Sequence, residues 1–153
     1  MKETLTLCMS GGPTAPSRAR TALRSLDRTL GELRDDVDLL VSELVSNSVL
    51  HANAERIVVQ AATGPDTVRI EVSDPGPGFR PAQARREPSL TGEGGYGLNI
   101  VDMVANRWGT TTDGKARVWF EIDRESRRQA RERADTAVAE PEGDRRFPEP
   151  APR

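Results

Sequence analysis

The sequence has little of several features that mark particular classes of protein. It contains one cysteine, Cys8, so the chain of 153 residues has no internal disulfide bond and suits a reducing compartment. Its first residues lack the apolar core of a signal peptide, and no run of about 18 apolar residues occurs anywhere. The formal net charge is −2, which gives no electrostatic basis for direct binding of nucleic acid. We therefore expect a soluble, cytoplasmic protein without membrane contact.

Aromatic residues are also scarce, at 4%, against 35% for all hydrophobic residues, so the core should be aliphatic. After Asp123 arginines alternate with acidic residues, and apolar residues other than alanine almost disappear. Burial in such a segment cannot offset the entropy lost on ordering. The composition predicts one folded domain over residues 1–123 and a charged, proline-rich, disordered tail over residues 124–153, with a frayed helical start at most.

Within the domain, alternation of polar and apolar residues predicts strands, and apolar residues at helical spacing predict helices. The predicted strands cover residues 4–9, 54–62, 67–73, 107–112 and 116–122, and the predicted helices cover residues 16–33, 35–52 and 98–105. Neighbouring hairpins with few parallel crossovers indicate an α+β fold. We expect a two-layer sandwich in which a mostly antiparallel sheet carries helices on one face.

The helix over residues 35–52 carries a carboxylate and an amide on one side. Glu43 and Asn47 are four residues apart and lie at the edge of the apolar stripe. An amide oxygen is a hard ligand suited to Mg²⁺, and a carboxylate can accept a proton. Taken alone, the pair is more typical of the polar flank of an ordinary helix.

Two glycine-rich segments follow the second hairpin strand. In the first, Asp74 ends the strand and is followed by Gly76 and Gly78. The glycines let the backbone approach a flat ligand, and the carboxylate can accept a hydrogen bond from an exocyclic amine. Asp, Pro and Gly are also the common residues of plain turns. In the second, a glycine cluster opens the helix over residues 98–105, where backbone N–H groups and the helix dipole favour phosphate. This cluster comprises Gly92, Gly94, Gly95 and Gly97.

The glycine cluster does not indicate either of two common nucleotide folds. Gly92, Gly94 and Gly97 match the dinucleotide-binding pattern G-x-G-x-x-G, but no strand precedes them and no βαβ unit surrounds them. The sequence also lacks the G-x-x-x-x-G-K-[ST] pattern of a P-loop. A glycine-rich segment can be merely flexible, so its meaning depends on the other two motifs.

Together, the order and spacing of the three motifs resemble the nucleotide-binding boxes of the Bergerat, or histidine-kinase-like, ATPase fold over roughly residues 4–122. The segments Glu-Leu-Val-Ser-Asn-Ser-Val-Leu-His-Ala (43–52), Asp-Pro-Gly-Pro-Gly-Phe (74–79) and Gly-Tyr-Gly-Leu-Asn-Ile-Val (95–101) are similar to those of bacterial anti-sigma-factor serine kinases, the stage II sporulation AB and general-stress W type. The resemblance implies ATP and Mg²⁺ as cofactors.

The same resemblance implies a role for each motif residue. Asn47 would be the Mg²⁺ ligand, Glu43 the catalytic base that orients the attacking hydroxyl, and Asp74 the residue that reads adenine. The glycines and the first helical residue after them would bind the rest of the nucleotide. Gly76 and Gly78 would shape the base pocket, Gly94, Gly95 and Gly97 would close on the phosphates, and Gly92 and Leu98 belong to the same nucleotide-binding segment.

The function implied is that of a serine/threonine kinase that phosphorylates a STAS-type anti-sigma-factor antagonist, sequesters a sigma factor and forms a homodimer. One position departs from the family, which often carries a threonine in the final strand beside the adenine-reading carboxylate; here that position is Ala116 or Arg117. The departure favours an alternative, a non-catalytic nucleotide-binding module that holds a transcription regulator. A third reading is a detached sensor-kinase domain. For His51 we expect a place at the end of its helix rather than a role as phosphoacceptor.

Overall fold

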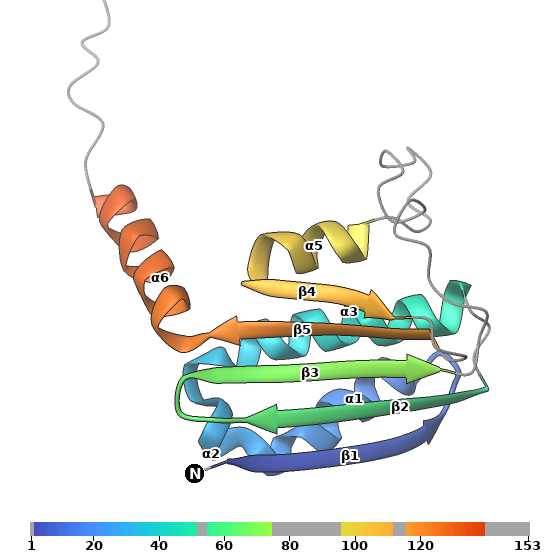
Figure 1. Ribbon diagram of the computed structural model, residues 1–153. Helices are drawn as coiled ribbons and strands as arrows, with labels where there is room; N and C mark the ends of the chain where they lie inside the picture. The colour runs from blue at the N-terminus through green and yellow to red at the C-terminus, as the bar shows by residue number, and fades with distance from the viewer. Residues whose placement is uncertain (1, 52–54, 75–95, 112–115, 140–153) are drawn as a thin grey trace, which may run out of the picture.

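The computed structural model describes residues 2–51, 55–74, 96–111 and 116–139, and consists of one sheet, a layer of helices and a projecting C-terminal helix (Figure 1). The sheet has five strands in the order β1-β2-β3-β5-β4, and every neighbouring pair is antiparallel. The strands are β1 (Glu3–Ser10), β2 (Arg56–Thr63), β3 (Thr67–Asp74), β4 (Arg107–Thr111) and β5 (Ala116–Asp123). The predicted α+β sandwich is confirmed.

Alternation along the strands determines which face of the sheet is buried. In β3, Val68, Ile70 and Val72 are buried and face the helices, whereas the residues between them are partly exposed. The turn that joins β2 to β3 is closed by a hydrogen bond of 2.8 Å from the amide of Gly64 to the carbonyl of Thr67. Phe120 is the only aromatic side chain among the large, fully buried residues of the described part, so the core is aliphatic as expected.

The helices α1 (Ala15–Leu23), α2 (Asp27–Leu30) and α3 (Arg34–His51) cover one face of the sheet, and α5 (Tyr96–Val104) packs against α3 and β4 (Figure 1). The sequence predicted one helix over residues 16–33, and this was wrong. Two short 3₁₀ segments, η1 (Arg24–Leu26) and η2 (Gly31–Leu33), interrupt it. Gly31 adopts a positive φ of 54°, which ends α2 and lets the chain turn before α3.

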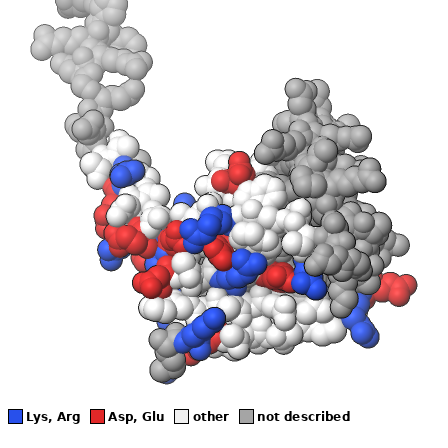
Figure 2. Space-filling view, viewed as in Figure 1, with Lys and Arg blue, Asp and Glu red and all other residues white. Residues whose placement is uncertain are grey.

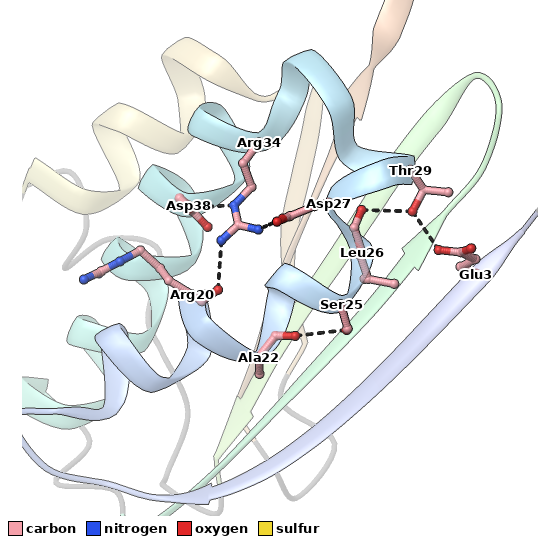
Figure 3. A network of polar contacts seen from close by, with 9 residues as sticks. All are labelled: Glu3, Arg20, Ala22, Ser25, Leu26, Asp27, Thr29, Arg34 and Asp38. Atoms are coloured by element: carbon pink, nitrogen blue, oxygen red, sulfur yellow. Dashed lines mark hydrogen bonds and ion pairs between the residues drawn. The ribbon is translucent and has the colours of Figure 1, made fainter.

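Arg34, the first residue of α3, joins the three N-terminal helices (Figure 3). Its guanidinium donates to the carboxylate of Asp38 at 2.9 Å, to the carbonyl of Arg20 at 2.9 Å, and to the carboxylate of Asp27. Within the same cluster Thr29 donates to Glu3 at 2.8 Å, which links α2 to β1. These contacts fix where α3 begins relative to the helices before it.

The opposite face of the sheet carries charges rather than helices. Figure 2 shows basic and acidic side chains alternating over β3, β5 and β4, and a mostly uncharged surface over β1 and β2. Glu121 accepts from Arg107 at 2.7 Å and from Arg69 at 2.8 Å, and these two arginines lower the pKa of the Glu121 carboxyl. The guanidinium of Arg69 also lies 4.1 Å from the centre of the Trp119 ring, a cation–π contact.

The C-terminal helix α6 (Arg124–Ala139) differs from the sequence prediction of disorder for these residues, and the rest of the predicted tail, residues 140–153, lies outside the described residues. The helix follows β5 directly and projects away from the sheet (Figure 1). The prediction failed because the helix is held by ion pairs with Asp36, which is 91 residues from Arg127 in the sequence. No helix in the described part of the chain is long and apolar enough to span a membrane.

Candidate nucleotide-binding site

Three elements that carry the sequence motifs meet at one end of the sheet. Helix α3 packs against both β3 and α5. In Figure 1 the C-terminal end of α3, the C-terminal end of β3 and the N-terminal end of α5 all lie at the same end of the molecule, opposite α6. The fold therefore brings the helix of the first motif, the strand of the second and the helix of the third to a common location.

Glu43 and Asn47 lie in the second half of α3, and both are half-buried. Between them Leu44 and Val45 are 2% and 0% exposed and pack into the core against the sheet. The core contacts therefore fix the rotation of α3 about its axis and place the two polar side chains at the border of the buried stripe. This is the flank position that the helical spacing predicted.

Asp74 is the last residue of β3 and is only 6% exposed. It continues the inward-facing row of Val68, Ile70 and Val72, so its carboxylate lies on the face of the sheet that α3 covers. Burial of a carboxylate at the end of a core row is costly unless polar groups compensate. The Asp74 carboxylate thus lies on the side of the sheet that carries α3, the helix of Glu43 and Asn47.

The strand register identifies the residue opposite Asp74. Asp74 pairs with Ala116 in the antiparallel ladder between β3 and β5, whereas Arg117 pairs with Ser73 on the next step. Of the two positions that the sequence left open for the missing threonine, Ala116 is the direct neighbour of the carboxylate. Thr110, a nearby threonine on β4, lies one strand further from β3 and is opposite Val118, which is two residues along from Ala116. Its hydroxyl therefore does not occupy the position next to Asp74.

The remaining motif residues are only partly covered by the described structure. Gly97 and Leu98 lie in the first turn of α5, which agrees with a glycine cluster that opens a helix. The predicted site glycines before that helix lie outside the described residues. These are Gly76, Gly78, Gly92, Gly94 and Gly95. His51 is the last residue of α3 (Arg34–His51), and the residues that follow it, 52–54, lie outside the described part of the chain.

The donor chemistry of the site fits Mg²⁺ in part. The amide oxygen of Asn47 is a hard ligand, and Mg²⁺ in nucleotide sites is usually held by one or two protein groups together with phosphate oxygens and water. In the part of the chain that the structure describes, no three His, Cys, Asp or Glu side chains gather as a metal site. Asn47 would thus hold the ion jointly with a bound nucleotide.

Family comparison assigns the fold and the motifs to a known class. The model of the histidine kinase-like ATPase domain family matches residues 13–122, which is most of the chain. The protein belongs to this family. The matched range contains α3, the end of β3 and the start of α5, so the site described above lies within the family domain.

Two known proteins are similar to the chain. The anti-sigma F factor of Oceanobacillus iheyensis is 27% identical over 115 residues, which cover 67% of this chain and 78% of that protein. The crystal structure of the RsbU and RsbW domains of a Mycobacterium tuberculosis protein matches with a TM-score of 0.57 and 22% identity. That alignment covers 78% of this chain but only 32% of the longer chain, so it shows a shared fold.

Proposed function

We propose that the protein is an ATP-dependent serine/threonine kinase that acts as an anti-sigma regulator and phosphorylates a STAS-type anti-sigma-factor antagonist. The observation that carries this proposal is the meeting of α3, with Glu43 and Asn47, and the buried Asp74 at one end of a histidine kinase-like ATPase fold. Similarity to the anti-sigma F factor supports the regulatory role. A sigma factor is then the second partner, and a homodimer the expected assembly.

Each residue has a defined task in this proposal. Asp74 accepts a hydrogen bond from the exocyclic amine of adenine, and Asn47 contributes an oxygen to Mg²⁺. When bound, Mg²⁺ neutralises charge on the phosphates. Glu43, one helical turn before Asn47, accepts the proton of the substrate hydroxyl as that oxygen bonds to the γ-phosphorus. The bond between the γ-phosphorus and the bridging oxygen breaks at the same time, and ADP leaves. Most of the rate enhancement comes from holding these groups in line, so small shifts of α3 matter.

Substitutions in α3 test the separate roles proposed for Glu43 and Asn47. Glu43→Ala should retain Mg²⁺-dependent ATP binding and lose transfer by about a hundredfold or more, because general-base catalysis contributes factors of this size. Asn47→Ala should lose the Mg²⁺ dependence of ATP binding. Calorimetry with and without Mg²⁺, together with transfer of labelled phosphate to a candidate antagonist, measures both effects.

Matched controls for this test are available in exposed positions. Glu55→Ala and Gln60→Ala remove a carboxylate and an amide from exposed positions outside α3, and both should behave as the unsubstituted protein. Phosphate transfer that survives in Glu43→Ala would show that Glu43 is not the base.

The alternative is a non-catalytic nucleotide-binding module that holds a regulator, and the pairing of Asp74 with Ala116 favours it. A methyl group cannot donate a hydrogen bond to the adenine-reading carboxylate. Incubation with labelled ATP and candidate antagonists separates the two functions, because only the kinase transfers acid-stable phosphate. Acid-labile phosphate on a partner histidine would instead identify a detached sensor-kinase domain.

A further inference from the structure

Two arginines of α6 hold a buried carboxylate at the start of α3. Arg127 donates from Nε to Asp36 Oδ2 and from a terminal nitrogen to Oδ1, both at 2.7 Å, and Arg131 donates to Oδ2 at 3.0 Å. Asp36 is 7% exposed. A bidentate pair of this kind fixes the orientation of both partners as well as their distance. The first turn of α3 is therefore attached to α6 by directional contacts.

The base of α6 is fixed to two further parts of the fold. The guanidinium of Arg124 donates to the carbonyls of Leu30 and Gly64, each at 3.1 Å, and to that of Thr29. Its backbone amide donates to the carbonyl of Asp66 at 2.9 Å. The helix thus has an anchored base, and residues 132–137 beyond it are exposed.

The anchored carboxylate lies in line with the candidate catalytic residues. Asp36, Glu43 and Asn47 are spaced i, i+7 and i+11, so Glu43 and Asn47 each lie within about 20° of Asp36 around the helix axis, on one side of α3. The distance from Asp36 to Glu43 along the helix axis is about 10 Å, or two turns. A helix of this length moves as a unit, so a shift at its first turn displaces the residues further along.

We propose that α6 is a strap that fixes α3 through Asp36 and thereby sets the position of Glu43 and Asn47. Asp36 is in this sense a positioning residue, and the strap regulates the site from the opposite end of the domain. The identity of the ligand rests on the proposed function, but the control of α3 by α6 does not. Loosening the strap should reduce the order of the second half of α3 and weaken whatever that half binds.

The decisive comparison is between two neighbouring aspartates in the first turn of α3. Asp36→Asn keeps the shape of the side chain and removes its charge, whereas Asp35→Asn removes an equivalent charge at an exposed position. Both substitutions alter the interaction with the helix dipole alike, so any difference in nucleotide affinity between the two variants measures the effect of the contacts between Asp36 and α6. Asp36→Asn should raise the dissociation constant for Mg²⁺-ATP by roughly three- to tenfold, and Asp35→Asn should leave it unchanged.

Calorimetry also distinguishes positioning from loss of folded protein. If Asp36 only stabilised the fold, Asp36→Asn would lower the number of binding sites per chain and leave the affinity of the folded fraction unaltered. The proposal requires the opposite, full stoichiometry with weaker affinity. Unchanged affinity in Asp36→Asn would overturn it.

Hydrogen exchange tests the strap without any nucleotide. In Asp36→Asn the amides of residues 43–47 should exchange roughly tenfold faster than in Asp35→Asn. If faster exchange is confined to α6 and the first turn of α3, the strap does not act on the site. A protein that binds no ATP would refute the proposed function, while this measurement still decides the strap.

A milder pair of variants serves if Asp36→Asn does not fold. Arg131→Gln removes one of the three hydrogen bonds to Asp36, and Arg128→Gln removes an exposed arginine on the same helix that pairs with Glu125. Faster exchange at residues 43–47 in the first variant and not in the second supports the strap. Equal exchange in both counts against it.

Discussion

Asp74 and Ala116 face each other across β3 and β5, and this pair of residues sets how well the carboxylate is supported. Side chains at directly opposed positions of an antiparallel ladder have Cβ atoms about 5 Å apart, within reach of a hydroxyl and a carboxylate. The methyl group of alanine provides volume without a donor. If Asp74 reads adenine as proposed, the side chain of Ala116 offers no hydrogen bond to its carboxylate.

Replacement of Ala116 by threonine should strengthen ATP binding. The added hydroxyl can donate to the Asp74 carboxylate, and a hydrogen bond to a charged group contributes about 1.5–3 kcal/mol, so we expect an affinity gain of about tenfold or more. Titration calorimetry with Mg²⁺-ATP measures it. Ala62→Thr, on the open face of β2, is the control. An unaltered affinity would argue that Asp74 does not bind the base.

Gly109 on β4 provides the space in which the Trp119 ring lies. A Cβ atom at this position would be 3.0–3.1 Å from three atoms of the indole, closer than ordinary contact. Gly109→Ala should therefore displace the ring from its contact with Arg69 and lower the free energy of unfolding by about 1 kcal/mol. Urea denaturation followed by tryptophan fluorescence measures this, and Gly64→Ala, where the nearest atom is 3.5 Å away, should have a smaller steric effect.

At the scale of elements, the contact between α3 and α6 makes stability depend on pH. Burial tends to raise the pKa of Asp36, but hydrogen bonds and charge from Arg127, together with Arg131, outweigh it and hold the pKa below the ordinary value of 3.8. Because the pKa is lower in the folded state than in the unfolded state, the ionised carboxylate stabilises the fold above about pH 4. This contribution is lost as the pH falls through the lowered pKa.

The pH dependence can be assigned to this one carboxylate by substitution. Asp36→Asn should lower the free energy of unfolding by about 1–3 kcal/mol at neutral pH, since it weakens hydrogen bonds between charged groups. The difference from the unsubstituted protein should shrink steadily below pH 4. Urea denaturation at several pH values measures it. A difference that stays constant down to the most acidic pH would show that the ion pairs do not stabilise the fold.

The elements could be predicted from the sequence where the local pattern determines them. Alternation gave the five described strands, and helical spacing gave α3 and all of α5 except its first two residues. The break in the first predicted helix was missed because the apolar spacing continues through Leu26 and Leu30, while the turn depends on the positive φ of Gly31. The spacing of apolar residues in the sequence does not indicate the φ angle of a glycine between them.

Helix α6 was missed for a different reason. Its stability depends on the contacts of Arg124, Arg127 and Arg131 with distant parts of the chain, and composition cannot reveal the position of Asp36. The spacing of these arginines, i, i+3 and i+7, was the available signal, since it places them on one side of a helix. The site motifs were recognisable in sequence, but the choice of Ala116 over Arg117 required the strand register.

At the scale of the whole molecule, ligand binding and folding are linked. If the site binds Mg²⁺-ATP only when folded, a nucleotide concentration of a hundred times the dissociation constant should add about 2.7 kcal/mol to the free energy of unfolding and raise the melting temperature by about 5–10 °C. Thermal denaturation with and without Mg²⁺-ATP tests this. Asn47→Ala should show little Mg²⁺-dependent stabilisation, and an equal shift in that variant would contradict the assigned ligand role.

The direct continuation of β5 into α6 has a practical consequence for anything joined to the end of this helix. Arg131, the last anchoring residue, is only about two helical turns from Ala139. A purification tag, a reporter or a surface tether joined directly after Ala139, in place of residues 140–153, would lie close to the contacts that hold Asp36. Protein carrying the same tag at its N-terminus is therefore the appropriate comparison in every nucleotide assay.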